Sequence, residues 1–197
     1  YGDIHLLNLP MFAIVGSRAA SPEGIRNAYS FAQALSAEGY LIISGLARGV
    51  DGAAHRGALR SNQGYRTIAV CGSGLDIVYP REHLDLAQAI AKSGLLVSEL
   101  APGLGPKAWH FPRRNRIIAA LSIGILVVEA AERSGSLITA RLGYELGREI
   151  FAIPGSIDSP LKKGCHQLLQ QGAKLVQSPK DILEELPKWS KTRFKGI

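Results

Sequence analysis

The segment 111–122 places three arginines and an asparagine near the expected start of a helix. Pro112 is typical of the first helical position, and the spacing of Ile117, Ile118 and Leu121 predicts one face packed on a core. A helix N-terminus carries about half a positive charge, so each cation in the first turn is unfavourable by up to about 1 kcal/mol. Backbone N–H groups and guanidinium groups at this end would together favour an anion, and phosphate is the natural candidate. The alternative is a solvated turn whose arginines pair with acids elsewhere. The residues concerned are Arg113, Arg114, Asn115 and Arg116.

Most of the predicted strands end in a loop of small residues. In an open parallel sheet the carboxyl ends of the strands meet at one edge, where ligands bind. Glycine there allows positive φ and a close approach of the backbone to a ligand. One such loop is explained by a tight turn, but a row of them would offer N–H donors to a chain of phosphates. The loops are Gly16-Ser17-Arg18, Ser44-Gly45-Leu46-Ala47-Arg48-Gly49, Gly72-Ser73-Gly74, Ser134-Gly135-Ser136 and Pro154-Gly155-Ser156.

Basic side chains are expected at the same edge. Each alone is typical of a solvated surface, but together they would neutralise several phosphates. They are Arg18, Arg48, Arg81, Lys162, Lys163 and Lys174.

Acidic residues and histidines accompany these cations. The acids could serve as general acids or metal ligands, but we expect them to cap helices or orient the arginines, because no cluster of His and Cys has metal-ligand spacing. His55 follows Asp51 by one helical turn and is expected to pair with it. His110 is expected either to stack on a base or to pack in the core. The acids are Asp51, Asp76, Glu99 and Glu129.

These residues must be positioned by alternating strands and helices. Continuous apolar runs predict strands buried on both faces, and their alternation with helices predicts an α/β fold with a doubly wound, mostly parallel sheet in a single domain. Residues 1–10 are expected to be extended, as an edge strand. The predicted strands are 12–15, 41–43, 67–70, 95–97, 123–128 and 150–153, and the predicted helices are 22–38, 52–60, 81–92, one from 112, 136–147, 164–171 and 179–186.

The bulk composition sets wider bounds. The chain has 197 residues, 46% of them apolar, and a formal net charge of +7, which suits one domain with a polyanionic partner. Cys71 and Cys165 are distant from each other, which predicts reduced thiols in a cytoplasmic protein. The sequence has no run of 18 apolar residues, so no membrane span is predicted. The chain begins at Tyr1, and we expect it to be part of a longer protein, with residues 1–186 as its Rossmann-like domain and 187–197 as a basic tail or linker.

Several common ligands and reactions lack their motifs here. The loop at Gly16 does not have the G-x-G-x-x-G spacing, and Ser44-Gly45 stands where a ribose-binding acid would follow the second strand, which argues against NAD or FAD. The Walker motif for ATP and the nucleophile elbow of hydrolases are also missing. We therefore expect no cofactor, no metal and no catalytic residue.

Seven segments of the chain, spread from about residue 2 to 186, resemble the DprA family, also called Smf, the DNA-processing proteins of bacterial transformation. Their number and order make the resemblance highly specific. The resemblance covers the family's central domain, and we expect the small N-terminal and winged-helix-like C-terminal domains of many members to lie outside residues 1–197. The segments are VGSR (15–18), SGLARGVDGAAH (44–55), GSGLDIVYPRE (72–82), FPRRNRIIAALS (111–122), EAAERSGSLITA (129–140), GREIFAIPGS (147–156) and GCHQLLQQGAK (164–174).

The resemblance implies a non-enzymatic protein that binds and shields single-stranded DNA, loads the recombinase RecA onto it and forms a homodimer. By the family's motifs, DNA contacts fall on Arg18 and Arg81, and the pocket is lined by Arg113, Asn115 and Arg116. Arg114 receives no role, nor does His166, which stands where the family usually has Asn. The alternatives are a nucleotide N-glycosidase of the lysine-decarboxylase-like group, whose Pro-Gly-Gly-x-Gly-Thr loop is missing here, and an oligomerisation or adaptor domain.

Overall fold

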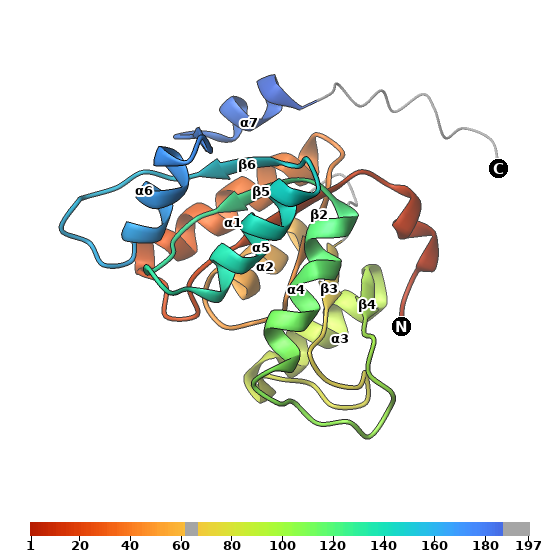
Figure 1. Cartoon of the computed structure of the whole chain (residues 1–197). Helices are drawn as coiled ribbons and strands as arrows, with labels where there is room; N and C mark the ends of the chain where they lie inside the picture. Colours follow the sequence, from red (N-terminus) through yellow and green to blue (C-terminus); the bar gives the residue numbers. More distant parts are fainter. Residues whose placement is uncertain (62–66, 187–197) are drawn as a thin grey trace.

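A sheet of seven parallel strands forms the centre of the molecule, in the order β4-β3-β2-β1-β5-β6-β7 (Figure 1). A computed structural model describes residues 1–61 and 67–186. The predicted α/β fold is confirmed. The strands are β1 (Met11–Val15), β2 (Leu41–Ser44), β3 (Thr67–Val70), β4 (Leu95–Val97), β5 (Ser122–Val127), β6 (Glu149–Ala152) and β7 (Lys174–Leu175).

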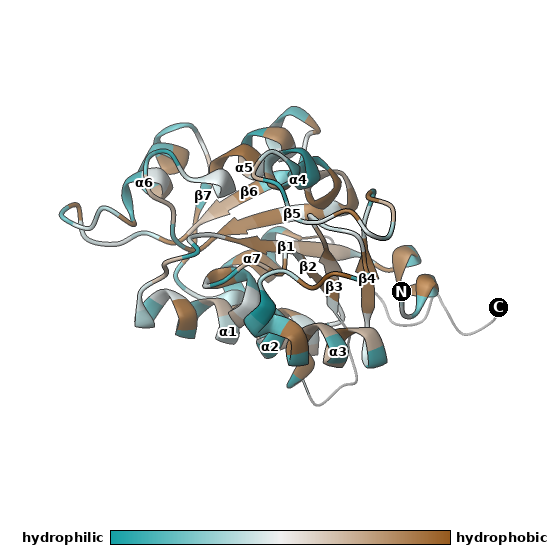
Figure 2. Ribbon diagram, turned by 90° about the horizontal axis from the view of Figure 1, so that it is seen from below, coloured by the Kyte–Doolittle hydropathy of each residue, from teal (hydrophilic) through white to brown (hydrophobic). Residues whose placement is uncertain are grey.

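Helices cover both faces of this sheet, as Figure 2 shows. α1, α2, α3 and α7 lie on one face, and α4, α5 and α6 lie on the other. Parallel strands need such crossover helices, and two covered faces explain the uninterrupted apolar strands. The helices are α1 (Pro22–Ala37), α2 (Val50–Leu59), α3 (Leu84–Ser93), α4 (His110–Leu121), α5 (Gly135–Glu145), α6 (Lys163–Gln170) and α7 (Pro179–Glu185), with 3₁₀ helices η1 (Ile4–Asn8) and η2 (Arg81–His83).

The alternation of side chains along each strand divides the core between the two faces. Met11, Ala13 and Val15 of β1 pack with buried residues of α4, α5 and α6. Phe12 and Ile14 point to the other face and pack with α1, α2 and α7. Because both faces are sealed by apolar contacts, polar chemistry is confined to the edges of the sheet.

The order of the strands selects one position on the carboxyl edge. The chain runs outward from β1 through β2 and β3 to β4, and then returns to β5, which pairs with β1. The connections on either side of this point leave on opposite faces, so a crevice opens between the ends of β1 and β5. A ligand site is therefore expected at this crevice.

Two elements differ from the sequence-based expectation. Residues 1–10 are not an edge strand; they form η1, whose cap Asp3 accepts a hydrogen bond from the backbone N–H of His5, and only Gly2 makes a bridge, to Leu95. The short edge strand β7 was not predicted, because two residues carry no periodicity. The predicted basic tail lies outside the described residues. Within the described ranges, no helix is both long and apolar enough to cross a membrane.

Candidate nucleic-acid interface

A polar pocket of about 530 Å³ lies at the crevice between the ends of β1 and β5. Its walls come from the loop after β1, the start of α2, the second turn of α4 and the start of α5. Five of the predicted site residues after β1 and β5 line it, and so does Asn115 of α4. These residues are Gly16, Ser17, Arg18, Ser134, Gly135 and Asn115.

A smaller pocket of about 210 Å³ adjoins it and shares Arg18. The guanidinium of Arg18 lies 5.0 Å from the ring centroid of Phe111, and the Phe111 and Tyr79 rings are 5.3 Å apart. Gly45 and Arg48 complete this wall. A cation held over the Phe111 ring, beside an open polar pocket, is a surface suited to a phosphate and a neighbouring base.

The helix that carries the arginines begins earlier than its sequence predicts. α4 starts at His110, so Pro112 occupies its third position, and Arg113, Arg114 and Arg116 lie beyond the first turn. The unfavourable interaction with the helix dipole fades after that turn. The argument that these arginines need an anion to offset the dipole is therefore wrong for this helix, and the three side chains have different environments.

Arg114 is buried, with 6% of its surface exposed. Its Nη1 donates to the carbonyl oxygens of Gly45, at 2.6 Å, and of Val70, while Nε donates to Oδ1 of Asn115 at 3.2 Å. It thereby joins α4 to the ends of β2 and β3. A sequence signal was available, because Arg114 precedes Ile118 by four positions and Leu121 by seven, the spacing of the buried face.

Asp51 lies beside Arg114 beneath the same loops. Its Oδ2 accepts hydrogen bonds from the backbone N–H groups of Gly45 and Ala47, at 3.1 and 3.3 Å. A Cβ at Gly45 would lie 2.4 Å from Nη2 of Arg114 and 2.7 Å from Oδ2 of Asp51. Both side chains therefore pack directly against the α-carbon of Gly45. Burial raises the pKa of Asp51, whereas the Arg114 charge and the two N–H groups oppose that rise. As expected, Asp51 organises a loop.

The other three acids also hold structure in place. Glu129 accepts from the backbone N–H and the hydroxyl of Ser21, at 2.9 and 2.6 Å, and thereby anchors the start of α1. Asp76 accepts from the backbone N–H of Gly103, and Glu99 pairs with Arg116. Glu129 therefore anchors the start of a helix and Glu99 pairs with an arginine, as predicted, whereas Asp76 holds a loop.

Several glycines of the loops pack closely against neighbouring elements, whereas Gly135 has open space around its α-carbon and lines the polar pocket. A Cβ at Gly16, Gly72 or Gly74 would lie within 3 Å of Val50, Phe111 or the carbonyl oxygen of Ala101, respectively. Of the loop glycines, Gly49 has a positive φ, of 70°, and Leu46 in the same loop also has a positive φ, of 59°.

The expected row of free N–H donors is also largely occupied. The N–H of Ser17 donates to the carbonyl of Glu129, and the N–H of Gly74 donates to the carbonyl of Leu104. Asp51 takes those of Gly45 and Ala47. The Ser73 hydroxyl is also used, by the carbonyl of Ile77. Loops packed this closely satisfy one another, so anion binding at this edge falls mainly to side chains.

The predicted cations divide into paired and unpaired groups. Arg48 forms an ion pair with Glu82 through two contacts, the second of 2.9 Å, and Arg116 pairs with Glu99. Within residues 1–61 and 67–186, exposed arginines of this edge that make no ion pair include Arg18, Arg81 and Arg113, and Arg133 adds a fourth that the sequence did not single out.

Two of the predicted lysines are directed elsewhere. Lys174 begins β7 and pairs with Glu149, at 3.1 Å, and with Glu185, which removes it from the candidate site. Lys162 is buried beside Glu129, at 3.8 Å, and donates to the carbonyl of Val128. The sequence predicted each lysine at the site from its distance to a glycine along the chain. That distance does not determine which way a flexible side chain points.

Of the two histidines, His55 differs from expectation, and His110 takes one of its two expected positions. His55 does not pair with Asp51; its Nδ1 lies 2.8 Å from the hydroxyl oxygen of Thr67. His110 is 5% exposed, and its Nδ1 lies 3.2 Å from the carbonyl oxygen of Gly72, so it packs in the core and cannot stack on a base.

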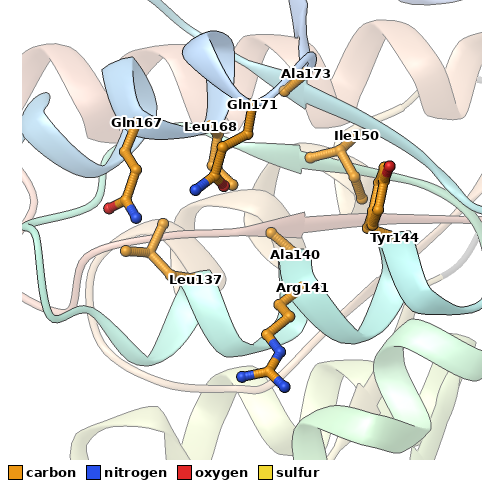
Figure 3. Close-up of a pocket in the computed structure, with 9 residues that line it drawn as sticks. All are labelled: Leu137, Ala140, Arg141, Tyr144, Ile150, Gln167, Leu168, Gln171 and Ala173. Carbon is orange, nitrogen blue, oxygen red and sulfur yellow. The ribbon is translucent and has the colours of Figure 1, made fainter.

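The structure also has an apolar pocket that contains none of the predicted site residues. It measures about 480 Å³ and lies between α5, α6 and the outer strands, as Figure 3 shows. Leu137 of α5 faces Gln167 and Gln171 of α6 across it, and Arg141 points away from α6. Because this pocket is apolar, it differs from the polar pocket at the carboxyl edge.

The chain matches a family model along almost its whole length. The model described as DNA recombination-mediator protein A aligns with residues 1–187. The chain belongs to this family. The DNA processing protein DprA of Streptococcus pneumoniae is 50% identical over 184 residues, 93% of this chain and 64% of that protein. Protein Smf of Escherichia coli is 51% identical over 186 residues, 94% of this chain and 49% of that protein. The chain thus spans about half to two thirds of these relatives of the DNA recombination-mediator protein A family.

Solved structures of the family share the fold. The X-ray structure of DprA from Streptococcus pneumoniae has a TM-score of 0.90 at 49% identity, covering 94% of this chain and 65% of that one. A structure described by the single-stranded DNA binding mode of DNA processing protein A from Helicobacter pylori has a TM-score of 0.85 at 31% identity, covering 93% and 83%. A molybdenum cofactor binding protein from Rippkaea orientalis, at 19% identity and a TM-score of 0.63, shares the fold.

Proposed function

We propose that this chain binds single-stranded DNA along the carboxyl edge of its sheet. The observation that carries the proposal is Arg18, an exposed guanidinium without an ion pair that lines both the polar pocket and the aromatic pocket. The name of the Helicobacter pylori relative describes single-stranded DNA binding, which supports the same ligand here.

The mechanism assigns the phosphates to arginine side chains. Arg18, Arg81, Arg113 and Arg133 hold the strand, and such contacts fix its position without reading its sequence. Ser17, Asn115, Ser134 and Gly135 line the polar pocket beside them. A base enters the smaller pocket next to Tyr79 and Phe111. The concave edge accepts a flexible strand in preference to a stiff duplex.

Replacing Arg18 with Ala tests this assignment. We expect affinity for an oligonucleotide to fall about 10- to 150-fold, the loss of about 1.5–3 kcal/mol expected for a hydrogen-bonded charge. The slope of log affinity against log salt should decrease by about 0.7, because one phosphate contact of a single strand is lost. Fluorescence anisotropy with single-stranded and duplex oligonucleotides at several salt concentrations measures both quantities.

The matched control is Arg60→Ala, which removes an exposed arginine at the C-terminal end of α2, at the opposite edge of the sheet. It should leave the affinity and the salt slope nearly unchanged. If Arg18→Ala binds as tightly as the parent chain, or if the parent prefers duplex DNA, the proposed site is wrong.

We propose no catalytic role for the chain. The segment that could correspond to a glycosidase loop, residues 131–139, forms a turn and the first half of α5, and both oxygens of the nearby Glu129 bind Ser21. Release of adenine from AMP on incubation with the protein would instead favour the N-glycosidase alternative.

The partners implied by the family extend the proposal. We propose that the bound strand is handed to RecA in the bacterial cytoplasm, and that the protein acts as a homodimer. For the dimer, the surface we favour is the apolar pocket between α5 and α6 together with its rim. Tyr144 on that rim is 71% exposed, and Leu175 of the edge strand β7 is 54% exposed. Leu175 pairs with Ala152, whose side chain faces the α5 and α6 side of the sheet, so it points to the pocket's side.

A charged residue on this surface should therefore prevent pairing. We expect Leu175→Asp and Tyr144→Asp each to weaken self-association at least about tenfold, because a carboxylate would be buried without a partner. Light scattering coupled to size-exclusion chromatography measures the change. The control Ile4→Asp, at a residue of η1 that is 65% exposed, should keep the parent's oligomeric state. Unchanged dimers in both test variants would place the interface elsewhere.

A further inference from the structure

Trp109 immediately precedes α4 and stands out among the aromatic residues near the candidate site. It is 55% exposed, whereas the adjacent His110 is buried. Single exposed apolar side chains are common on protein surfaces, so exposure alone assigns no role to this residue. The residues around Trp109 indicate its role.

The first of these neighbours, His110, contacts the indole edge to face. The ring centroids of Trp109 and His110 are 4.1 Å apart, with an angle of 73° between their planes. His110 is itself held in the core against the carbonyl of Gly72, at 3.2 Å, and its backbone N–H donates to the carbonyl of Lys107 at 2.9 Å. A platform that is rigid before binding loses less conformational entropy when a ligand stacks on it.

The second group of neighbours supplies charge. Trp109 has helical dihedral angles, φ −77° and ψ −15°, so Arg113 lies one helical turn further along the same face. Arg113 and His110 both line a small pocket of about 130 Å³ that also contains Gly72 at the end of β3. Lys107, two residues before Trp109 in the sequence, is exposed. An exposed indole with Arg113 one helical turn away offers a stacking face for a base next to a cation for its phosphate.

We infer that Trp109 is a base-stacking platform for single-stranded DNA, beyond the pockets that contain Arg18. The inference rests on the proposed function and adds a contact that neither pocket contains. Arg113 binds the phosphate next to the stacked base. The strand therefore extends along the carboxyl edge from the crevice at β1 and β5 toward the end of β3.

The test separates stacking from charge. The chain has two tryptophans, so Trp189→Phe leaves Trp109 as the only one. In that background, oligo(dT) should quench the indole fluorescence on binding. Trp109→Ala should lower the affinity for oligo(dT) about 5- to 150-fold, the equivalent of 1–3 kcal/mol per stacked base, and leave the salt slope unchanged. Trp109→Phe should restore most of the loss.

An abasic oligomer with the same number of phosphates completes the design. The parent and Trp109→Ala should bind it equally, because no base remains to stack. Tyr1→Ala is the control for an exposed aromatic ring, since Tyr1 is 76% exposed beside the amino end of β4. It should bind oligo(dT) like the parent.

Three results would overturn the inference. They are unchanged oligo(dT) affinity in Trp109→Ala, unquenched fluorescence during saturable binding, and an equal loss of affinity for the abasic oligomer. If Arg18→Ala is impaired in the same assay, the proposed function stands while the inference fails. If the parent chain binds no single strand at all, the proposed function itself fails.

Discussion

Replacing Arg114 with Met should destabilise the chain by about 3–5 kcal/mol, the usual effect of removing one partner from a buried pair of opposite charges. The carboxylate of Asp51 would stay buried without the neighbouring guanidinium. The carbonyl oxygens of Gly45 and Val70 would also lose their shared donor. Urea denaturation followed by circular dichroism measures the difference in the free energy of unfolding.

The interaction between the two residues can be isolated with a second substitution. Asp51→Asn should also destabilise the chain, and the double variant should lose less than the sum of the two single losses, because no unpaired buried charge remains. Lys180→Met serves as the control, since its partner Glu184 lies on the same exposed face of α7. It should change stability by less than about 0.5 kcal/mol. A loss below about 1 kcal/mol in Arg114→Met would contradict the structural role assigned to this residue.

Acidification should also destabilise the chain through His55. Burial, together with the charges of His83, Arg114 and Arg56, lowers the pKa of His55 from 6.5 to about 3. The imidazole is fully buried, its Nδ1 binds the Thr67 hydroxyl, and its Nε2 has no hydrogen-bond partner within the described part of the chain. Since Thr67 donates its own proton to the carbonyl of Ile42, Nδ1 carries the imidazole proton.

The sign of this effect follows from proton binding in the two states. Between pH 6.5 and pH 3 the unfolded chain protonates His55 and the folded chain does not, so the free energy of unfolding decreases as the pH falls. The contribution is about 1.4 kcal/mol per pH unit well below pH 6.5, or about 3 kcal/mol by pH 4. His55→Asn lacks the titrating ring, so the stability difference between the parent and this variant should shrink by that amount.

Urea denaturation at a series of pH values provides the measurement. His5→Asn is the control, because His5 lies on the exposed part of η1. Its stability should follow the parent's pH dependence. A constant difference between the parent and His55→Asn from pH 7 to pH 4 would show that His55 is not held neutral in the folded protein.

The sequence predicted the family of the chain fully, but it predicted the residues of the candidate site only in part. The long motifs identified the family, which the family model confirms over residues 1–187. The sequence also predicted the strands that precede Arg18 and Ser134. Both residues line the same pocket. By contrast, the roles of Arg114, Lys174 and His55 depend on partners that are distant in sequence, at Gly45, Glu149 and Thr67.

The sequence by itself determined the layered α/β architecture. Uninterrupted apolar strands must be buried on both faces, and amphipathic helices bury them by packing their apolar sides on the sheet. Only the tertiary structure decided which charges remain available to a ligand. Arg18 and Arg48 both follow predicted strands, yet Glu82 occupies Arg48 and no acid within the described residues pairs with Arg18. Local spacing sets the position of a backbone segment, whereas the pairing of a long side chain is set by whatever the fold brings within a few ångströms of its end.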